Sequence, residues 1–227
     1  MKDVTVELPF GQKFVEIEVP RRNLIAIVEP RQVQAAVDGT VEAERALRNP
    51  IGEERISNLV KKGSRVVILS EDNTRPTPVN EILPPILKEL NECGVRDRDI
   101  TAIMALGTHR PMTQKEISKK LGKEIAERIE AVNHDCEDSE SLEDLGKTSK
   151  GTPIFVSKTA LKADFMIGVG MICPHRVAGY GGGAKIVQPG ISGKVTTGHT
   201  HWMSALYEAE KIMGTEQNPV REEMNEI

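Results

Sequence analysis

Aromatic residues are scarce in this sequence. Its 227 residues include one tryptophan, two tyrosines and four phenylalanines, and the formal net charge is -4 at pH 7. Proteins that bind nucleic acid need a cationic surface to neutralise phosphates, and those that bind single strands add aromatic platforms on which bases stack. Because both features are missing, the sequence predicts no nucleic-acid partner.

Cysteine is also rare, with only Cys93, Cys136 and Cys173 in the chain. Their odd number, their wide spacing and the lack of a CxxC pair exclude a disulfide framework and a zinc ribbon. We interpret all three as reduced thiols. Cys173 lies two residues before His175, but no base partner is close in sequence, so a nucleophilic role is the weaker interpretation.

Long hydrophobic runs are absent as well. No apolar stretch approaches the roughly 18 residues of a membrane-spanning helix, and the amino terminus lacks the apolar core of a signal peptide. The sequence therefore predicts no membrane span and, by default, a cytoplasmic location. Hydrophobic residues still make up 38% of the chain, which is enough for a substantial buried core.

The first sixty residues predict a hairpin followed by helices. Val4–Glu7 and Phe14–Val19 alternate apolar and polar residues around the turn at Pro9-Phe10-Gly11-Gln12, which is typical of a half-buried β-hairpin. The other expected elements are a strand at residues 24–28 and helices at residues 32–37 and 41–47, with a stop at Asn49-Pro50.

From residue 64 onward, strand and helix patterns alternate. The expected strands are 65–69, 100–105, 131–133, 153–156 and a buried strand at 165–169; the expected helical stretches are 79–91, 114–129, 204–213 and 219–227. Such alternation implies right-handed crossovers and a mostly parallel sheet. The fold class is therefore α/β, a mostly parallel Rossmann-like sheet with flanking helices, preceded by a β-hairpin.

Three local signals refine the helices. Thr77 before Pro78 is typical of an N-cap followed by proline in the first turn. Thr113 with Glu116 three residues later predicts a capping box. The pair Pro84-Pro85 falls inside the first long helix, where proline is expected to kink or split it.

The glycine-rich stretch after the strand at 165–169 is the strongest functional signal. It runs from Cys173-Pro174-His175 through Gly179 and Gly181-Gly182-Gly183 to Lys185. Glycines let backbone N–H groups approach an anion or a flat cofactor closely. No hydroxyl residue follows Lys185, so this is not the phosphate loop of a nucleoside triphosphatase. A simple turn with a solvated lysine is the alternative.

Two more loops carry candidate residues at the ends of predicted strands. Asp72 and Arg75 follow the strand at 65–69, where the planar guanidinium of Arg75 suits a carboxylate or phosphate. His109 follows the strand at 100–105 and could act as a general base. Because parallel strands end at the same sheet edge, these side chains, His175 and Lys185 are expected to meet there. Taken singly, each loop is equally consistent with a capped turn or a structural histidine.

A histidine pair, His199 and His201, follows in the sequence Gly198-His199-Thr200-His201. The spacing places both rings on one side of a strand but about 200° apart on a helix, so it is a weak two-ligand metal motif. One histidine as a single metal ligand is easier to support. His134 lies in an acidic loop, and we interpret it as an ordinary surface residue outside the site.

Together these motifs resemble the amino-terminal domain of the nickel-dependent lactate racemase family. The resemblance covers residues 64–202 in order and rests on four segments: Asp72-Asn73-Thr74-Arg75-Pro76, Gly107-Thr108-His109-Arg110, Pro174-His175-Arg176 with Gly181-Gly182-Gly183-Ala184-Lys185, and His201. Members of that family racemise or epimerise 2-hydroxy acids with a nickel pincer nucleotide. In this cofactor, nickel is bound to a pyridinium-3,5-bisthiocarboxylic acid mononucleotide.

The resemblance implies a role for each residue. Lys185 would hold the cofactor covalently, His201 would complete nickel coordination, and His109 and His175 would be the paired acid/base residues. Arg75 would bind the substrate carboxylate with support from Asp72. The cofactor-binding residues would be Lys185, Asp72, Thr74, Gly182 and Gly183. The choice of His201 over His199, and the identity of the 2-hydroxy acid, stay open.

The resemblance also implies a domain organisation. Residues 1–63 (hairpin and helices) and 64–227 (α/β core) would form the amino-terminal catalytic and cofactor-binding part of a longer protein. The helix-like segment at the end of the chain has no glycine or proline terminator, which favours the same interpretation. A carboxyl-terminal domain would then be its partner, and this chain alone would be weakly active or inactive.

Hydride chemistry explains why such a protein needs a cofactor. Removing hydride from a 2-hydroxy acid leaves a stable 2-keto acid, and no side chain is an adequate hydride acceptor. Two alternatives belong to other classes of protein. One is a cofactor-free module that binds phosphate or carboxylate; the other is a zinc hydrolase using His175, His199 and His201.

Overall fold

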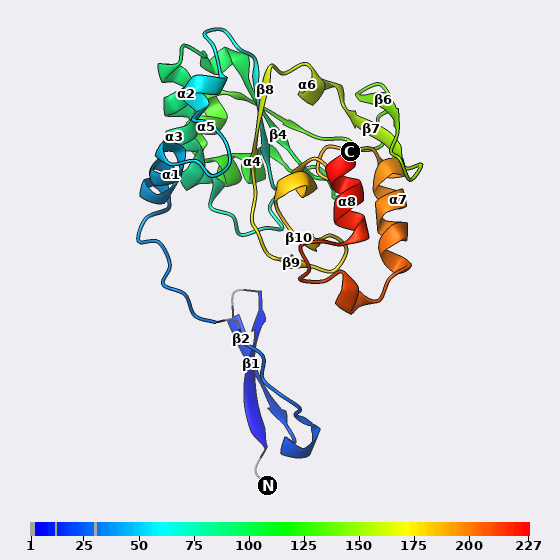
Figure 1. Ribbon diagram of the computed structural model, residues 1–227. Coiled ribbons are helices and arrows are strands. Elements are labelled where there is room, and N and C mark those ends of the chain that lie inside the picture. The colour runs from blue at the N-terminus through cyan, green and yellow to red at the C-terminus, as the bar shows by residue number, and fades with distance from the viewer. Residues whose placement is uncertain (1–2, 12, 30) are drawn as a thin grey trace. The chain divides into compact units, whose positions relative to one another are not determined.

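A computed structural model describes residues 3–11, 13–29 and 31–227. The chain divides into two compact units, residues 1–37 and residues 38–227. Within the described residues, every helix is too short or too polar to cross a membrane. Figure 1 labels the elements.

The first unit is an antiparallel hairpin of β1 (Val4–Phe10) and β2 (Lys13–Val19), followed by a 3₁₀ turn at Arg21–Asn23. The hairpin prediction is confirmed, although Gln12 of its turn lies outside the described residues. Its side chains are more exposed than expected. The pairing places Val4, Val6 and Leu8 opposite Val19, Ile17 and Val15, so one face of the ribbon is apolar.

Two predictions for the following segment are wrong. Residues 24–28 form no strand and residues 32–37 form no helix. Val33 and Val37 are exposed in this segment, so no packing surface stabilises a short helix. The helix expected at 41–47 is present as α1 (Gly39–Arg48), where Asp38 caps the amino end and Asn49 the carboxyl end.

The second unit contains a four-stranded, fully parallel sheet in the order β5-β4-β3-β8. Its strands are β3 (Val66–Ser70), β4 (Ile100–Met104), β5 (Glu130–Asn133) and β8 (Phe165–Val169). This confirms the α/β prediction. The strand β8 is not buried as expected, because it lies at the sheet edge with Met166 46% exposed.

Helices cover both faces of the sheet (Figure 1). Alternate residues of β3 point to opposite faces, so Val66 and Ile68 pack in one core and Val67 and Leu69 in the other. The first core is closed by α3 (Val79–Glu92), α4 (Gln114–Leu121) and α5 (Lys123–Arg128), and α2 (Ile56–Leu59) lies near α3.

The second core includes residues of β7 (Pro153–Ser157) and α6 (Lys158–Leu161), and β6 (Leu142–Lys147) pairs with β7. The remaining elements follow β8. They are β9 (Pro174–His175), β10 (Gly179–Tyr180), α7 (Lys194–Ala205) and α8 (Pro219–Glu226), with 3₁₀ turns at Gly183–Ile186 and Ala209–Lys211. One further 3₁₀ turn, Asp97–Asp99, directly precedes β4.

Some local predictions hold and others do not. Thr113 and Glu116 form the expected capping box. The helix α3 runs unbroken through Pro84 and Pro85, because its buried face packs into the core and outweighs the lost backbone hydrogen bonds. Thr77 does not cap α3; its hydroxyl donates to Glu71 instead. The stretch 204–213 is not one helix, since α7 ends at Ala205.

Candidate active site at the carboxyl edge of the sheet

One cavity gathers most of the residues that the sequence singled out, but Gly183 and His199 are not in its lining. It has a volume of about 110 Å³. Its lining includes Asp72, Thr74 and Arg75 after β3, His109 after β4, His175, Gly182 and Lys185 after β8, and His201 on α7. The expected convergence at the carboxyl ends of the strands is therefore present in the structure.

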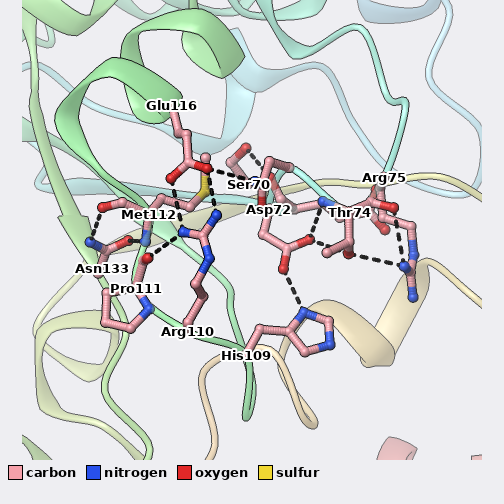
Figure 2. Close-up of polar contacts among 12 residues, drawn as sticks. Ser70, Asp72, Thr74, Arg75, His109, Arg110, Pro111, Met112, Glu116 and Asn133 are labelled. Atoms are coloured by element: carbon pink, nitrogen blue, oxygen red, sulfur yellow. Dashed lines mark hydrogen bonds and ion pairs between the residues drawn. The ribbon is translucent and has the colours of Figure 1, made fainter. Parts of the chain in front are cut away.

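The loops after β3 and β4 meet through a histidine–aspartate pair. His109 Nδ1 lies 2.5 Å from Asp72 Oδ2 (Figure 2). Thr74 donates to the other carboxylate oxygen from its backbone N–H, at 3.0 Å, and from its hydroxyl, at 2.6 Å. Asp72 is only 4% exposed. Its carboxylate therefore orients His109, and among the described residues no hydrogen bond joins it to Arg75.

The ionisation of Asp72 follows from these contacts. Burial disfavours its charged form, but the hydrogen bonds from Thr74 and His109 outweigh burial and hold its pKa below the ordinary value. Asp72 is thus an anion at neutral pH. The carboxylate of Asp72 can only accept a hydrogen bond, so Nδ1 of His109 carries a proton, and in a neutral ring the free lone pair is on Nε2.

His175 has the opposite arrangement. Its Nδ1 accepts the backbone N–H groups of Val177 at 3.2 Å and Ala178 at 3.3 Å. The proton of the neutral ring is therefore on Nε2. Burial, together with the positive charges of Lys185 and Arg75, lowers the pKa of His175 to about 4. At neutral pH His175 is uncharged.

Lys185 lies in the 3₁₀ turn that follows the glycines. Burial lowers the pKa of its amine, and the positive charge of Arg75 lowers it further, while Glu71 acts in the opposite direction. A lowered pKa increases the fraction of neutral, nucleophilic amine. Lys185 is therefore suited to a covalent bond with a ligand.

The geometry separates the two histidines of α7. His201 lines the cavity, and its Nδ1–H donates to the carbonyl of Thr197 at 2.8 Å. Its Nε2 is then left as an acceptor, the usual state of a metal-ligating imidazole. His199 is not among the cavity-lining residues, because two positions on a helix differ by about 200°.

No group of three or more histidine, cysteine, aspartate or glutamate side chains is arranged to hold a metal ion among the described residues. The zinc hydrolase alternative required His175, His199 and His201 together. His199 does not line the cavity that His175 and His201 line, so these three histidines do not form one metal site.

Arg75 borders the same cavity from the loop after β3. One terminal nitrogen, Nη1, donates to Thr74, at 3.1 Å to the hydroxyl and 3.4 Å to the carbonyl. Within the described part of the chain, its Nε and Nη2 atoms have no hydrogen-bond acceptor. These donors are available to an anionic ligand.

Several supporting residues were missed from the sequence. Glu116 accepts a bidentate ion pair from Arg110 and a hydrogen bond from Asn73, so it fastens the loops after β3 and β4 to α4 (Figure 2). The ion pair lowers the pKa of Glu116 to about 2. Glu71 lines the cavity and accepts hydrogen bonds from Thr77 and from the backbone of Met171. No local motif announces these contacts, which join segments distant in sequence.

His134 is the other correction. It was expected on the surface, but it is buried, and its Nε2 lies 3.0 Å from the carbonyl of Ser192. Burial lowers its pKa. It lies outside the cavity lining, so its exclusion from the site is consistent with the structure.

Comparison with known proteins places these features in a family. Residues 10–214 match the family described as "Lactate racemase N-terminal domain". The chain is 30% identical to the lactate racemase of Thermoanaerobacterium thermosaccharolyticum over 222 residues, which are 96% of this chain and 52% of that protein. It is 32% identical to the lactate racemase of Lactiplantibacillus plantarum over 202 residues, 87% of this chain and 47% of that protein.

Solved structures agree with the sequence comparison. The lactate racemase apoprotein of Thermoanaerobacterium thermosaccharolyticum matches with a TM-score of 0.82 at 29% identity, over 98% of this chain and 52% of that one. A Thermotoga maritima protein matches with a TM-score of 0.67 at 27% identity, over 82% of this chain and 45% of that one. The chain spans about half the length of the curated relatives that it matches. A profile match across most of its length shows that the chain belongs to the family of lactate racemase amino-terminal domains.

Proposed function

We propose that this chain carries the proton-transfer and cofactor-binding groups of a racemase or epimerase for a lactate-like 2-hydroxy acid. One observation carries the proposal: Arg75, His109, His175, Lys185 and His201, which are far apart in sequence, line one cavity. Family membership supports the same reaction class. The lactate racemase activity is that of the named relatives, and we assign it to this chain only as part of the proposal.

The residues present fit a nickel pincer nucleotide. A covalently held cofactor needs a nucleophilic amine, and burial makes Lys185 one. Nickel needs a donor of borderline softness, and His201 offers an imidazole Nε2 whose other nitrogen is fixed by Thr197. A flat ring needs a close backbone approach, and Gly182, with a φ of 72°, gives the cavity wall no side chain. Lys185 and His201 would hold the group, with contacts from Asp72, Thr74 and Gly182, which line the cavity, whereas Gly183 does not line it.

When bound, the nickel pincer nucleotide supplies a hydride acceptor that no amino-acid side chain provides. The side chains of this protein have the remaining tasks. Arg75 binds the carboxylate of the hydroxy acid through its unpaired guanidinium donors. His109 takes the hydroxyl proton at Nε2, since Asp72 holds its Nδ1–H.

His175 provides the matching donor. Its Nε2–H can hydrogen-bond to the substrate oxygen when the planar 2-keto acid is reduced on its other face, and the proton that completes the new hydroxyl group returns from the imidazolium of His109. The two rings therefore present one acceptor and one donor nitrogen to the substrate oxygen. Interconversion of two enantiomers requires such a pair, because the hydroxyl group lies differently in each.

A further, carboxyl-terminal domain is part of the proposal. A cavity of about 110 Å³ is smaller than the roughly 300–1,000 Å³ of sites that enclose drug-sized ligands. This chain would then supply a half-site in which most of a nucleotide projects from the cavity. We expect the 227-residue chain, even with cofactor, to racemise lactate weakly or not at all by itself.

The test uses lactate deuterated at C2 and this chain extended by its carboxyl-terminal domain, produced together with nickel and the cofactor-making enzymes, and the product enantiomers are separated chromatographically. Deuterium retained at C2 of the opposite enantiomer supports hydride transfer. Exchange of that deuterium with water would contradict it. His109→Asn and His175→Asn should abolish product, whereas His199→Asn, a histidine on the same helix as His201 but off the cavity, should not.

The same material tests the cofactor-free binding module. That alternative predicts lactate binding that is unchanged by nickel and no racemised product. The racemase proposal predicts that any product formed depends on nickel and on Lys185.

A further inference from the structure

The glycine-rich loop is held from outside the cavity by one arginine. Arg221, on α8, donates to three backbone carbonyls of this loop: Nε to Ala178 at 3.3 Å, Nη1 to Gly182 at 3.2 Å, and Nη2 to Tyr180. The side chain is partly buried. Among the described residues, no carboxylate lies within ion-pair distance of it, so its charge is directed only at the loop.

The three carbonyls are next to the candidate functional groups. Ala178 also donates its backbone N–H to Nδ1 of His175, at 3.3 Å. The carbonyl of Gly182 also accepts the backbone N–H of Lys185, at 3.2 Å. Arg221 thus binds the carbonyl of Ala178, the residue whose N–H contacts Nδ1 of His175. It also shares an acceptor, the carbonyl of Gly182, with the N–H of Lys185.

The surrounding segment supports the same attachment. Gly214 donates its N–H to the carbonyl of Gly179 at 3.0 Å, and Asn218 donates to the carbonyl of Ala178 at 3.5 Å. A Cβ on Gly179 would lie 2.1 Å from the carbonyl oxygen of Thr215, so only glycine permits this approach. The family match ends at residue 214, before Arg221.

We infer that Arg221 is a positioning residue of the site, which fixes the Nε2–H tautomer of His175 and the backbone of Lys185 by binding the carbonyls of the glycine-rich loop. A planar guanidinium can serve three divergent acceptors, whereas an ammonium or an apolar side chain cannot. The inference rests on the proposed function only for the roles it gives to His175 and Lys185. The contacts themselves can be measured without cofactor or substrate.

The first measurement is the ¹⁵N spectrum of the histidine rings at neutral pH, in the chain without cofactor. In the parent, His175 should show one tautomer with the proton on Nε2. In Arg221→Met, which keeps side-chain length but removes all donors, the signal should shift toward a mixture of tautomers. Arg128→Met is the control, because Arg128 also forms a multidentate contact, with Asp97 and Asn91, away from the cavity.

The second measurement is amide hydrogen exchange. In Arg221→Met, exchange at Val177, Ala178 and Lys185 should accelerate by about tenfold or more, since charge-assisted hydrogen bonds are lost. Amides of β3 and β4 should keep their protection. In Arg221→Ala, added methylguanidine should restore both the tautomer and the protection, an effect that a general loss of stability would not show.

An unchanged tautomer and unchanged exchange in Arg221→Met would overturn the inference, and so would equal changes in Arg128→Met. If Arg221→Met does not fold, Arg221→Lys replaces it, and an intermediate increase in exchange confined to residues 177–185 is expected. Neither readout depends on racemisation. A failure of the deuterium experiment would therefore leave the Arg221 result standing, and the reverse also holds.

Discussion

His109 Nδ1 and Asp72 Oδ2 lie 2.5 Å apart, although 37 positions separate the two residues in sequence. The pair joins the loops after β3 and β4 in the lining of the cavity. It fixes the tautomer of His109. The carboxylate of Asp72 can only accept a hydrogen bond, so the proton stays on Nδ1 and Nε2 is left as the acceptor.

Asp72→Asn tests that relationship. An amide can present its NH₂ to Nδ1 and so reverse the tautomer of His109, which removes the acceptor at Nε2. We expect racemisation by the cofactor-loaded protein that includes its carboxyl-terminal domain to fall by about 10²–10⁴-fold. Asp164→Asn is the control, since Asp164 pairs with Arg65 away from the cavity. Equal rates for Asp72→Asn and the parent would show that His109 does not depend on Asp72.

The pH dependence of stability follows from the buried histidines. The pKa of His175 is about 4 in the folded protein, against an ordinary value of 6.5. Between these values the unfolded chain binds a proton that the folded chain does not. The contribution of His175 to stability is therefore fully present above pH 6.5 and is lost as the pH falls toward about 4. Burial lowers the pKa of His134 also, so it contributes with the same sign.

Urea unfolding at pH 7.0 and pH 4.5 measures this effect. The parent should lose stability at the lower pH, and His175→Gln should lose less of it. A loss that is the same in both proteins would remove His175 as a contributor.

Lys120 holds the loop of Arg75. Its Nζ donates to the carbonyls of Arg75 at 2.7 Å and Thr77 at 3.1 Å, in a buried position. Lys120→Met should leave both carbonyls without this donor and cost about 1–3 kcal/mol of unfolding free energy. Lys119→Met, at the exposed neighbour, should change stability by less than about 0.5 kcal/mol. Similar unfolding curves for the two variants would refute this role.

Alanine substitutions at Gly179 and Gly198 give a matched comparison of two glycines in different surroundings. Gly179 has a φ of 79° and no room for a Cβ, whereas a Cβ on Gly198, inside α7, meets nothing within 4 Å. Gly179→Ala should therefore destabilise the loop, by more than the roughly 1–3 kcal/mol of backbone strain alone. Gly198→Ala should stabilise by up to about 1 kcal/mol. Thermal unfolding of both variants measures these changes. An unchanged melting temperature for Gly179→Ala would show that the loop is not packed in this way.

Sequence patterns were sufficient for the sheet and for the members of the cavity. Periodicity located all four parallel strands, and the rule that parallel strands end at one edge brought Arg75, His109 and Lys185 together. What the sequence could not show was pairing across loops. Asp72 has several possible partners nearby in sequence, and only the fold brings His109 to it rather than Arg75.

Other misses have the same origin. The helix α7 was not predicted, because Thr196, Thr197 and Gly198 have low helix propensity and tertiary packing overrides it. His134 is polar and lies in an acidic loop, so it was expected to be exposed. It is buried because the carbonyl of Ser192 gives its Nε2 a hydrogen-bond partner. Arg221 has no motif around it, and its acceptors lie about forty residues earlier.

The proposed function depends above all on Lys185 as the attachment point of a nickel-carrying cofactor. Peptide mass spectrometry of the protein produced with nickel and the cofactor-making enzymes tests it most directly. We predict a mass adduct confined to the peptide that contains Lys185, together with bound nickel, and loss of both in Lys185→Ala but not in Lys194→Ala. An unmodified Lys185 in protein that retains nickel, or nickel retained by Lys185→Ala, would contradict the account.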